Sequence, residues 1–136
     1  MAQTQQMALL TVTVDGFTLG VFDTKSGGET TAEPTKRRAG GMGAHKSYAA
    51  LPDHGDVTVS RDYDLERDHE LVRRLRPRVG RARMTISEQP LDEDGAPWGR
   101  PVVYTGRLIG VSPSEVDSDS TDAAMFELSA QVTEIA

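Results

Sequence analysis

Apolar and polar residues alternate along most of this chain, which predicts several strands with one buried face. The segments with this period are residues 8–14, 56–62, 82–88 and 124–135. Residues 17–22 follow the dipeptide Asp15-Gly16, which favours a tight turn, so they are expected to pair with residues 8–14 as a hairpin. One more strand is expected over residues 102–111.

After residue 62 the apolar positions recur at helical spacing and predict one short helix. They are Leu65, Leu71, Val72, Leu75 and Val79. Asp62 or Asp64 can accept from the free amides at the helix start, and Pro77 is expected to end the helix. Acidic residues in the first turn and arginines in the last complement the helix dipole.

Residues 24–50 contain five glycines and too few apolar side chains to join a core. A segment of this length and composition is either disordered or a functional arm that becomes ordered on a partner. We expect an extended assembly arm, in which residues 29–32 can pair as an extension of the first hairpin.

The order of these elements predicts a mainly β fold. We expect an antiparallel β-sandwich or barrel of six to seven strands, with one α-helix and a long loop or hairpin arm. Gly106 and Gly110 interrupt a strand and suit bulges in a curved sheet. A length of 136 residues fits a single domain over residues 1–136.

Composition excludes several classes of protein. The absence of cysteine rules out disulfides and thiolate metal sites. The chain has neither the basic start and apolar run of a signal peptide nor about 20 consecutive apolar residues, so we expect synthesis in the cytoplasm and no membrane partner. The net charge of −6 argues against a sequence-reading nucleic-acid binder, although a series of arginines from 73 to 83 keeps phosphate contact as an alternative.

The two halves of the chain differ in charge. Residues 1–83 hold 13 Lys and Arg against 11 Asp and Glu, a balance of +2, whereas residues 84–136 hold 2 against 10, a balance of −8. A chain polarised in this way suits contacts in which unlike ends of two copies meet. The alternative is that the charges mix in space once the chain folds.

No motif for catalysis stands out, so we expect no enzyme activity, no catalytic residue, no metal and no cofactor. The acidic cluster of residues 62–70 is interpreted as a solvated helix face, because its acids are not forced to converge. The loop from Asp117 lacks the glycine and glutamate positions of an EF-hand, which leaves only weak calcium binding open there.

The order of the predicted elements and the composition of several segments resemble those of a known family, the tail tube proteins of bacteriophages, in particular of phages that infect actinobacteria. The segments that carry the resemblance are residues 12–16, 19–22, 26–29, 38–43, 55–61, 103–108, 118–120 and 126–128. Relatives of this family form the inner tubes of contractile tails and of type VI secretion systems.

The resemblance implies a structural virion protein of the phage tail. Its copies would close into six-membered rings, and the rings would stack into a hollow tube through which DNA passes without specific binding. Further implied partners are the tape measure protein and the tail terminator and distal tail proteins. The arm would lie on a neighbouring subunit or ring.

Two sets of residues follow as candidates for assembly. Contacts between rings or subunits are expected from Lys36, Arg37, Arg38, Gly40, Gly41, Met42, Arg73, Arg74, Arg76, Arg78, Asp117, Asp119 and Asp122. Within this set, the arginines are expected to face the acids across the interface, because a basic rim opposite an acidic one favours one polarity of stacking. Candidates for the lumen wall are Asp56, Thr58 and Ser60, or Glu127, Ser129, Gln131 and Thr133.

Three other interpretations stay open at this point. The chain could be a monomeric β-barrel that binds a ligand, although one Trp, three Tyr and three Phe supply little aromatic lining. It could be a hydrolase with a metal on the helix. It could also be the inner tube subunit of a contractile injection system.

Overall fold

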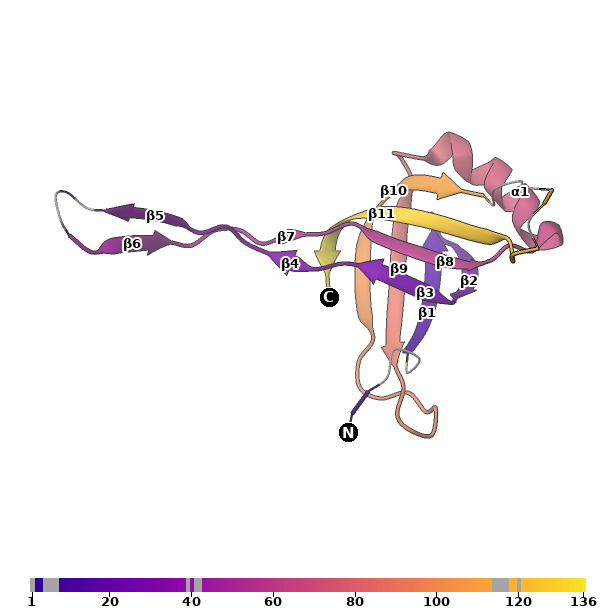
Figure 1. The fold of residues 1–136 in the computed structure, drawn as a ribbon, viewed down its shortest axis with the longest axis horizontal. Coiled ribbons are helices and arrows are strands. Elements are labelled where there is room, and N and C mark those ends of the chain that lie inside the picture. Colours follow the sequence, from indigo (N-terminus) through magenta and orange to yellow (C-terminus); the bar gives the residue numbers. More distant parts are fainter. Residues whose placement is uncertain (1, 4–7, 39, 41–42, 114–117, 120) are drawn as a thin grey trace.

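The chain folds into a curled antiparallel sheet from which a narrow two-stranded arm projects (Figure 1). The computed structural model describes residues 2–3, 8–38, 40, 43–113, 118–119 and 121–136. The strands are β1 (Ala8–Val14), β2 (Phe17–Phe22), β3 (Thr24–Gly27), β4 (Thr30–Thr31), β5 (Thr35–Arg38), β6 (His45–Tyr48), β7 (Asp53–His54), β8 (Val57–Asp62), β9 (Arg83–Pro90), β10 (Val102–Ser112) and β11 (Met125–Ile135). The helices are α1 (Leu65–Leu75) and the 3-10 turn η1 (Arg76–Arg78).

Seven strands form the main sheet in the order β2-β1-β9-β10-β11-β8-β3, and every neighbouring pair is antiparallel. Its two edge strands, β2 and β3, are consecutive in the chain and are separated only by Asp23. The amide of Asp23 donates to the carbonyl of Ser60 on β8, at 2.9 Å. One continuous segment therefore joins both edges, and the sheet curls into a barrel.

The buried face of each strand follows the alternation in the sequence. On β11, for example, Phe126, Leu128, Ala130 and Val132 are buried and the residues between them are not. Together with the seven-stranded sheet and one α-helix in the described ranges, this confirms the predicted mainly β fold. The predicted bulges are present as well, because the pairing of β10 with β11 shifts register at Gly106 and near Gly110.

Helix α1 begins after Asp64, whose side chain accepts from the amide of Glu66. Of the two predicted caps, the structure therefore uses Asp64. The predicted apolar stripe is wrong at its ends, because Leu65 and Val79 are exposed. The residues that α1 buries are Asp68, Val72 and Leu75.

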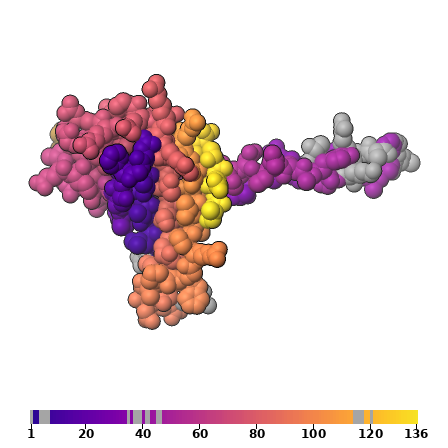
Figure 2. Space-filling model, turned by 180° about the vertical axis from the view of Figure 1, so that it is seen from behind, coloured from indigo at the N-terminus to yellow at the C-terminus, as the bar shows by residue number. Residues whose placement is uncertain are grey.

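The arm continues the ladder between β3 and β8 away from the barrel. Its strands pair as β4 with β7 and then as β5 with β6. In Figures 1 and 2 it extends from the body as a thin rod. The predicted range of 24–50 differs from the projecting part, since β3 belongs to the main sheet and the returning strand of the arm reaches His54.

Candidate assembly interfaces

The root of the arm is fixed to the barrel. At the end of β3, Gly27 has a φ of +87°, and a methyl group there would overlap the carbonyl oxygen of Asp56, so only glycine fits the bend. Beside it, Nζ of Lys25 donates to the hydroxyl of Tyr104 and pairs with the carboxylate of Glu88, both at 3.0 Å. Burial alone would lower the pKa of Lys25, but these hydrogen bonds raise it above the ordinary lysine value. The bend at Gly27 and the contacts of Lys25 with Tyr104 and Glu88 therefore set the direction in which the arm leaves the barrel.

Beyond this root the arm has no core. Its described side chains between residues 29 and 53 are all exposed, Lys36 and Gly40 among them. Main-chain pairing holds it together, with help from a 3.0 Å contact between Oγ1 of Thr30 and Nδ1 of His54. The main chain of Arg37 and Arg38 forms part of β5. Gly41 and Met42 lie outside the described residues.

Arginines gather where α1 ends. Arg73, Arg74 and Arg76 are exposed, and Arg73 lies 3.7 Å from Glu70. Arg78 has a structural partner within the chain, because its Nη1 donates to the carboxylate of Asp15 at 2.6 Å.

Asp15 ties the first hairpin to the segment after the helix. Its other carboxylate oxygen accepts from the amide of Arg83 at 3.0 Å. That backbone hydrogen bond and the one from Arg78 hold the pKa of Asp15 below its ordinary value. Between this hairpin and α1 lies a groove of about 710 Å³ lined by Val14, Asp15, Phe17, Thr18, Leu19, Leu71, Arg74, Leu75 and Arg78.

The acidic segment after β10 starts at the same end of the barrel as these arginines. Pro113 lines one small cavity together with Arg73 and Arg76. Asp119 and Asp122 are described and exposed, whereas Asp117 lies outside the described residues. The pairing of these acids with arginines of another copy stays a prediction.

The opposite end of the barrel carries a second acidic surface. The loop between β9 and β10 holds Asp92, Glu93 and Asp94, followed by Trp98, which is 62% exposed. The signal was present in the sequence as the run Asp-Glu-Asp-Gly next to the only tryptophan of the chain.

The two candidate lumen sets lie on one face. Strands β8 and β11 are neighbours, and Thr58 pairs with Ser129 while Ser60 pairs with Glu127. Oγ1 of Thr58 and Oγ of Ser129 are 3.3 Å apart. The structure places the candidates as follows: Asp56, Glu127, Gln131 and Thr133 exposed, Thr58 and Ser129 half-buried, and Ser60 buried against Thr24. Instead of two alternative walls, the barrel has one polar strand face.

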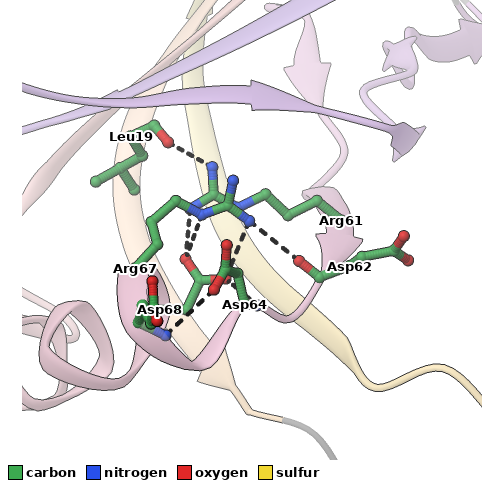
Figure 3. Close-up of polar contacts among 7 residues, drawn as sticks. Leu19, Arg61, Asp62, Asp64, Arg67 and Asp68 are labelled. Carbon is green, nitrogen blue, oxygen red and sulfur yellow. Dashed lines mark hydrogen bonds and ion pairs between the residues drawn. The ribbon is translucent and has the colours of Figure 1, made fainter.

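A buried ion pair joins α1 to the barrel (Figure 3). Arg61, at the end of β8, donates through Nη2 to Oδ1 of Asp68 at 2.7 Å, and the two side chains are 3% and 0% exposed. Nη1 of Arg61 donates to the carbonyl of Leu19 on β2, and its guanidinium lies 4.4 Å from the ring of Phe22. Arg61 therefore bridges β8, β2 and the helix.

The interpretation of Asp68 as part of a solvated helix face is wrong. Its carboxylate also accepts from Nε of Arg67 at 3.1 Å and from the amide of Asp64 at 2.9 Å. Burial alone would raise the pKa of Asp68, but the hydrogen bonds from Arg67, Asp64 and Arg61 lower it below the ordinary value. For Arg61, burial is the largest influence and lowers its pKa.

Among the described residues, no group of three His, Asp or Glu side chains is arranged to hold a metal ion. No described helix is long and apolar enough to cross a membrane.

Solved structures with the same architecture come from phage-like particles. The chain superposes on a chain of the six-fold symmetrised anti-feeding prophage baseplate with a TM-score of 0.75 and 16% identity, over 100% of this chain and 95% of that one. The fold is one found in contractile injection systems. It also matches a chain from the extended PVC sheath–tube complex of an extracellular contractile injection system, with a TM-score of 0.66, 13% identity and coverage of 93% and 86%.

A third match is a chain from the cap that terminates the anti-feeding prophage tube, with a TM-score of 0.65, 14% identity and coverage of 98% and 88%. The sequence itself matches no protein-family model and no curated protein. At the level of the fold, the resemblance inferred from the sequence is confirmed. At sequence identities this low, the matches establish the fold alone.

Proposed function

We propose that this chain is a structural subunit of a phage tail tube, whose copies close into six-membered rings that stack into a hollow conduit for DNA. The observation that carries the proposal is the arm, which is anchored rigidly at Gly27 and Lys25 but has no core of its own. The match of the whole fold to chains from a baseplate, a sheath–tube complex and a tube cap supports it.

The arm has a clear physical need for a partner. An isolated two-stranded ribbon is at best marginally stable in water, because it buries too little apolar surface to offset the ordering of its backbone. A second copy of the chain can supply the missing surface. Lys36, Arg37, Arg38, Gly40, Gly41 and Met42 are then contact residues, as the resemblance implies.

The polar face of β8 and β11 is the proposed wall of the conduit. Six copies with a net charge of −6 each give a ring charge of about −36. A wall with exposed Asp56 and Glu127 repels phosphate at short range, so that DNA moves past without adhering. In a phage tail, the tape measure, terminator and distal tail proteins are the expected partners at the interior and the two ends.

The test compares the full chain with an arm-shortened variant by negative-stain electron microscopy and light scattering. In the variant, residues 30–54 are replaced by Asn-Gly, a two-residue turn that suits the hairpin geometry where the amide of Gly55 meets the carbonyl of Glu29 at 2.8 Å. We expect rings or tubes from the full chain, and a folded monomer with β-type circular dichroism from the variant. A full chain that stays monomeric at high concentration would overturn the proposal.

The comparisons favour a second candidate, a tube or baseplate subunit of a contractile injection system, because the matched chains come from such particles. Particles that contain this chain distinguish the two. A single-walled tail supports the phage tube of a non-contractile particle, whereas an outer sheath that shortens on triggering supports the contractile system.

A further inference from the structure

We propose that the loop of residues 91–101 in one copy docks, through Trp98, into the groove between α1 and the β1–β2 hairpin of a second copy in the next ring. This inference rests on the proposed tube function and names the surfaces through which rings stack. The partner is a second copy of this chain, and the contact is head to tail.

Hydrogen bonds within the loop hold its main chain. Oδ1 of Asp92 accepts from the amides of Asp94 and Ala96 at 2.9 and 2.8 Å, which closes the turn from inside. The amide of Trp98 donates to the carbonyl of Pro90 at 2.9 Å. A loop held in this way loses little conformational entropy when it binds, and its exposed Trp98 is the residue type most enriched at the energetic centres of interfaces.

The groove offers complementary chemistry. Its lining includes the apolar residues Leu71, Leu75 and Phe17, and Phe17 is 64% exposed. Arg74 and Arg78 line the same groove. A volume of about 710 Å³ lies within the range that holds a large ring together with its neighbours. When the indole of Trp98 lies between these apolar residues, the carboxylates of Glu93 and Asp94 can pair with Arg74 and Arg78.

The two surfaces lie at opposite ends of the same strands. In the pairing of β1 with β9, Val14 lies opposite Met84 at the groove end, and Ala8 lies opposite Pro90 at the loop end. Seven residues of strand separate these ends by about 20 Å. Figure 1 shows α1 at one end and the connection from β9 to β10 at the other, and in Figure 2 this connection projects below the body.

A loop at this distance cannot fill the groove of its own copy. The groove must then take the loop of another copy. In the stacked rings of the proposed tube this contact is heterologous, and repeating it generates a stack with a single polarity. The acidic segment after β10 is a poorer partner for such a stack, because it begins beside Arg73 and Arg76 at the groove end. A contact between stacked rings requires an acidic surface at the end of the barrel opposite the groove, and the loop between β9 and β10 supplies it.

The experiment uses full-length protein and two pairs of substitutions, imaged by negative stain. The loop variant carries Trp98→Ala and Asp94→Lys, and the groove variant carries Phe17→Ser and Arg74→Glu. All four positions are exposed, so the barrel is expected to fold, which circular dichroism verifies. Each variant is expected to form rings but to need at least about a tenfold higher concentration than wild type to form tubes.

Mixing the two variants tests polarity. For this test the rings are formed first from the single variants Trp98→Ala and Arg74→Glu, so that no exchanged charges meet. A Trp98→Ala ring still has an intact groove, and an Arg74→Glu ring still has an intact loop, so an equal mixture should yield pairs of rings and no long tubes. Because Trp98 is the only tryptophan, its fluorescence reports the contact directly. Tubes of wild type should show blue-shifted emission that acrylamide no longer quenches.

A charge exchange guards against variants that simply misfold. Asp94→Lys and Arg74→Glu are each expected to impair stacking alone and to restore it together. The matched control is Arg81→Glu, which makes the same charge reversal at an exposed position outside the groove and should leave tubes unchanged. Tubes from both paired variants, tryptophan emission unchanged on assembly, or a block by Arg81→Glu instead of Arg74→Glu would each overturn the docking. Rings without this contact would overturn only the docking, whereas a wild type without rings would overturn the tube function with it.

Discussion

The buried pair of Arg61 and Asp68 allows a sharp test of what attaches the helix to the barrel. The perturbation is Asp68→Ala. It removes a fully buried carboxylate that accepts hydrogen bonds from Arg61, Arg67 and the amide of Asp64. The guanidinium of Arg61, only 3% exposed, then remains inside without a counter-ion, and its Nε already has no hydrogen-bond partner.

The expected cost is large on the scale of a small domain. Removing one partner of a buried ion pair typically costs about 3–5 kcal/mol, against a total stability of about 5–15 kcal/mol. With a urea dependence of about 2 kcal/mol per molar, the unfolding midpoint should fall by about 2 M. The matched control is Glu70→Gln, which breaks an exposed contact with Arg73 on the same helix and should change stability by at most about 0.5 kcal/mol.

Urea unfolding followed by far-ultraviolet circular dichroism gives the free energies, at two protein concentrations so that assembly is separated from folding. The double variant Arg61→Met with Asp68→Leu removes both charges and leaves the carbonyl of Leu19 without its donor, at a cost of about 1–3 kcal/mol. We expect it to be more stable than Asp68→Ala alone. If Asp68→Ala matches the Glu70→Gln control, or if the double variant is no more stable than Asp68→Ala, the pair does not hold the helix as described.

Two further predictions follow from the same structure. Gly106→Ala should destabilise the protein strongly, because the new methyl group would overlap the carbonyl oxygen of Gln131 on β11. At Gly110 the nearest atom to a new methyl group is 3.5 Å away, so Gly110→Ala should be tolerated. Thermal unfolding of the two variants tests this difference. Because the pKa of Asp68 is lowered on folding, its contribution is present above the ordinary aspartate pKa and is lost as the pH falls through the folded value. The gap in unfolding free energy between wild type and Asp68→Asn should therefore shrink below about pH 4, and a gap independent of pH would contradict the lowered pKa.

Much of the fold was accessible from local pattern. Alternation placed β1 at its observed bounds, and the turn at Asp15-Gly16 placed β2. Asp64 was one of two expected helix caps. Local pattern also singled out the arm, since its glycine-rich and polar composition cannot form a core. These features are decided by neighbours within a few residues, which a sequence displays directly.

The interfaces were less accessible, because they depend on which ends of the barrel carry which charges. The acidic residues near 117–122 looked like the natural counterpart of the helix arginines in a chain with two oppositely charged halves. Folding brings Pro113, which precedes these acids, to the arginine end and leaves Asp92, Glu93 and Asp94 at the other. Because antiparallel strands reverse the direction of the chain several times, the order of charges along the sequence does not show at which end of the barrel each charge lies.

The sequence by itself determined six strands of the main sheet, the helix and the presence of an arm, because periodicity and turn chemistry are local properties of the backbone. Only the tertiary structure decided that Asp68 is buried, since its partner Arg61 comes from β8 and also donates to the carbonyl of Leu19 on β2, on a separate part of the chain. An acid on a helix is ordinarily a solvated one, and nothing in its immediate neighbours distinguishes it. Whether a charge is stable inside the protein depends on the distant groups that fold around it.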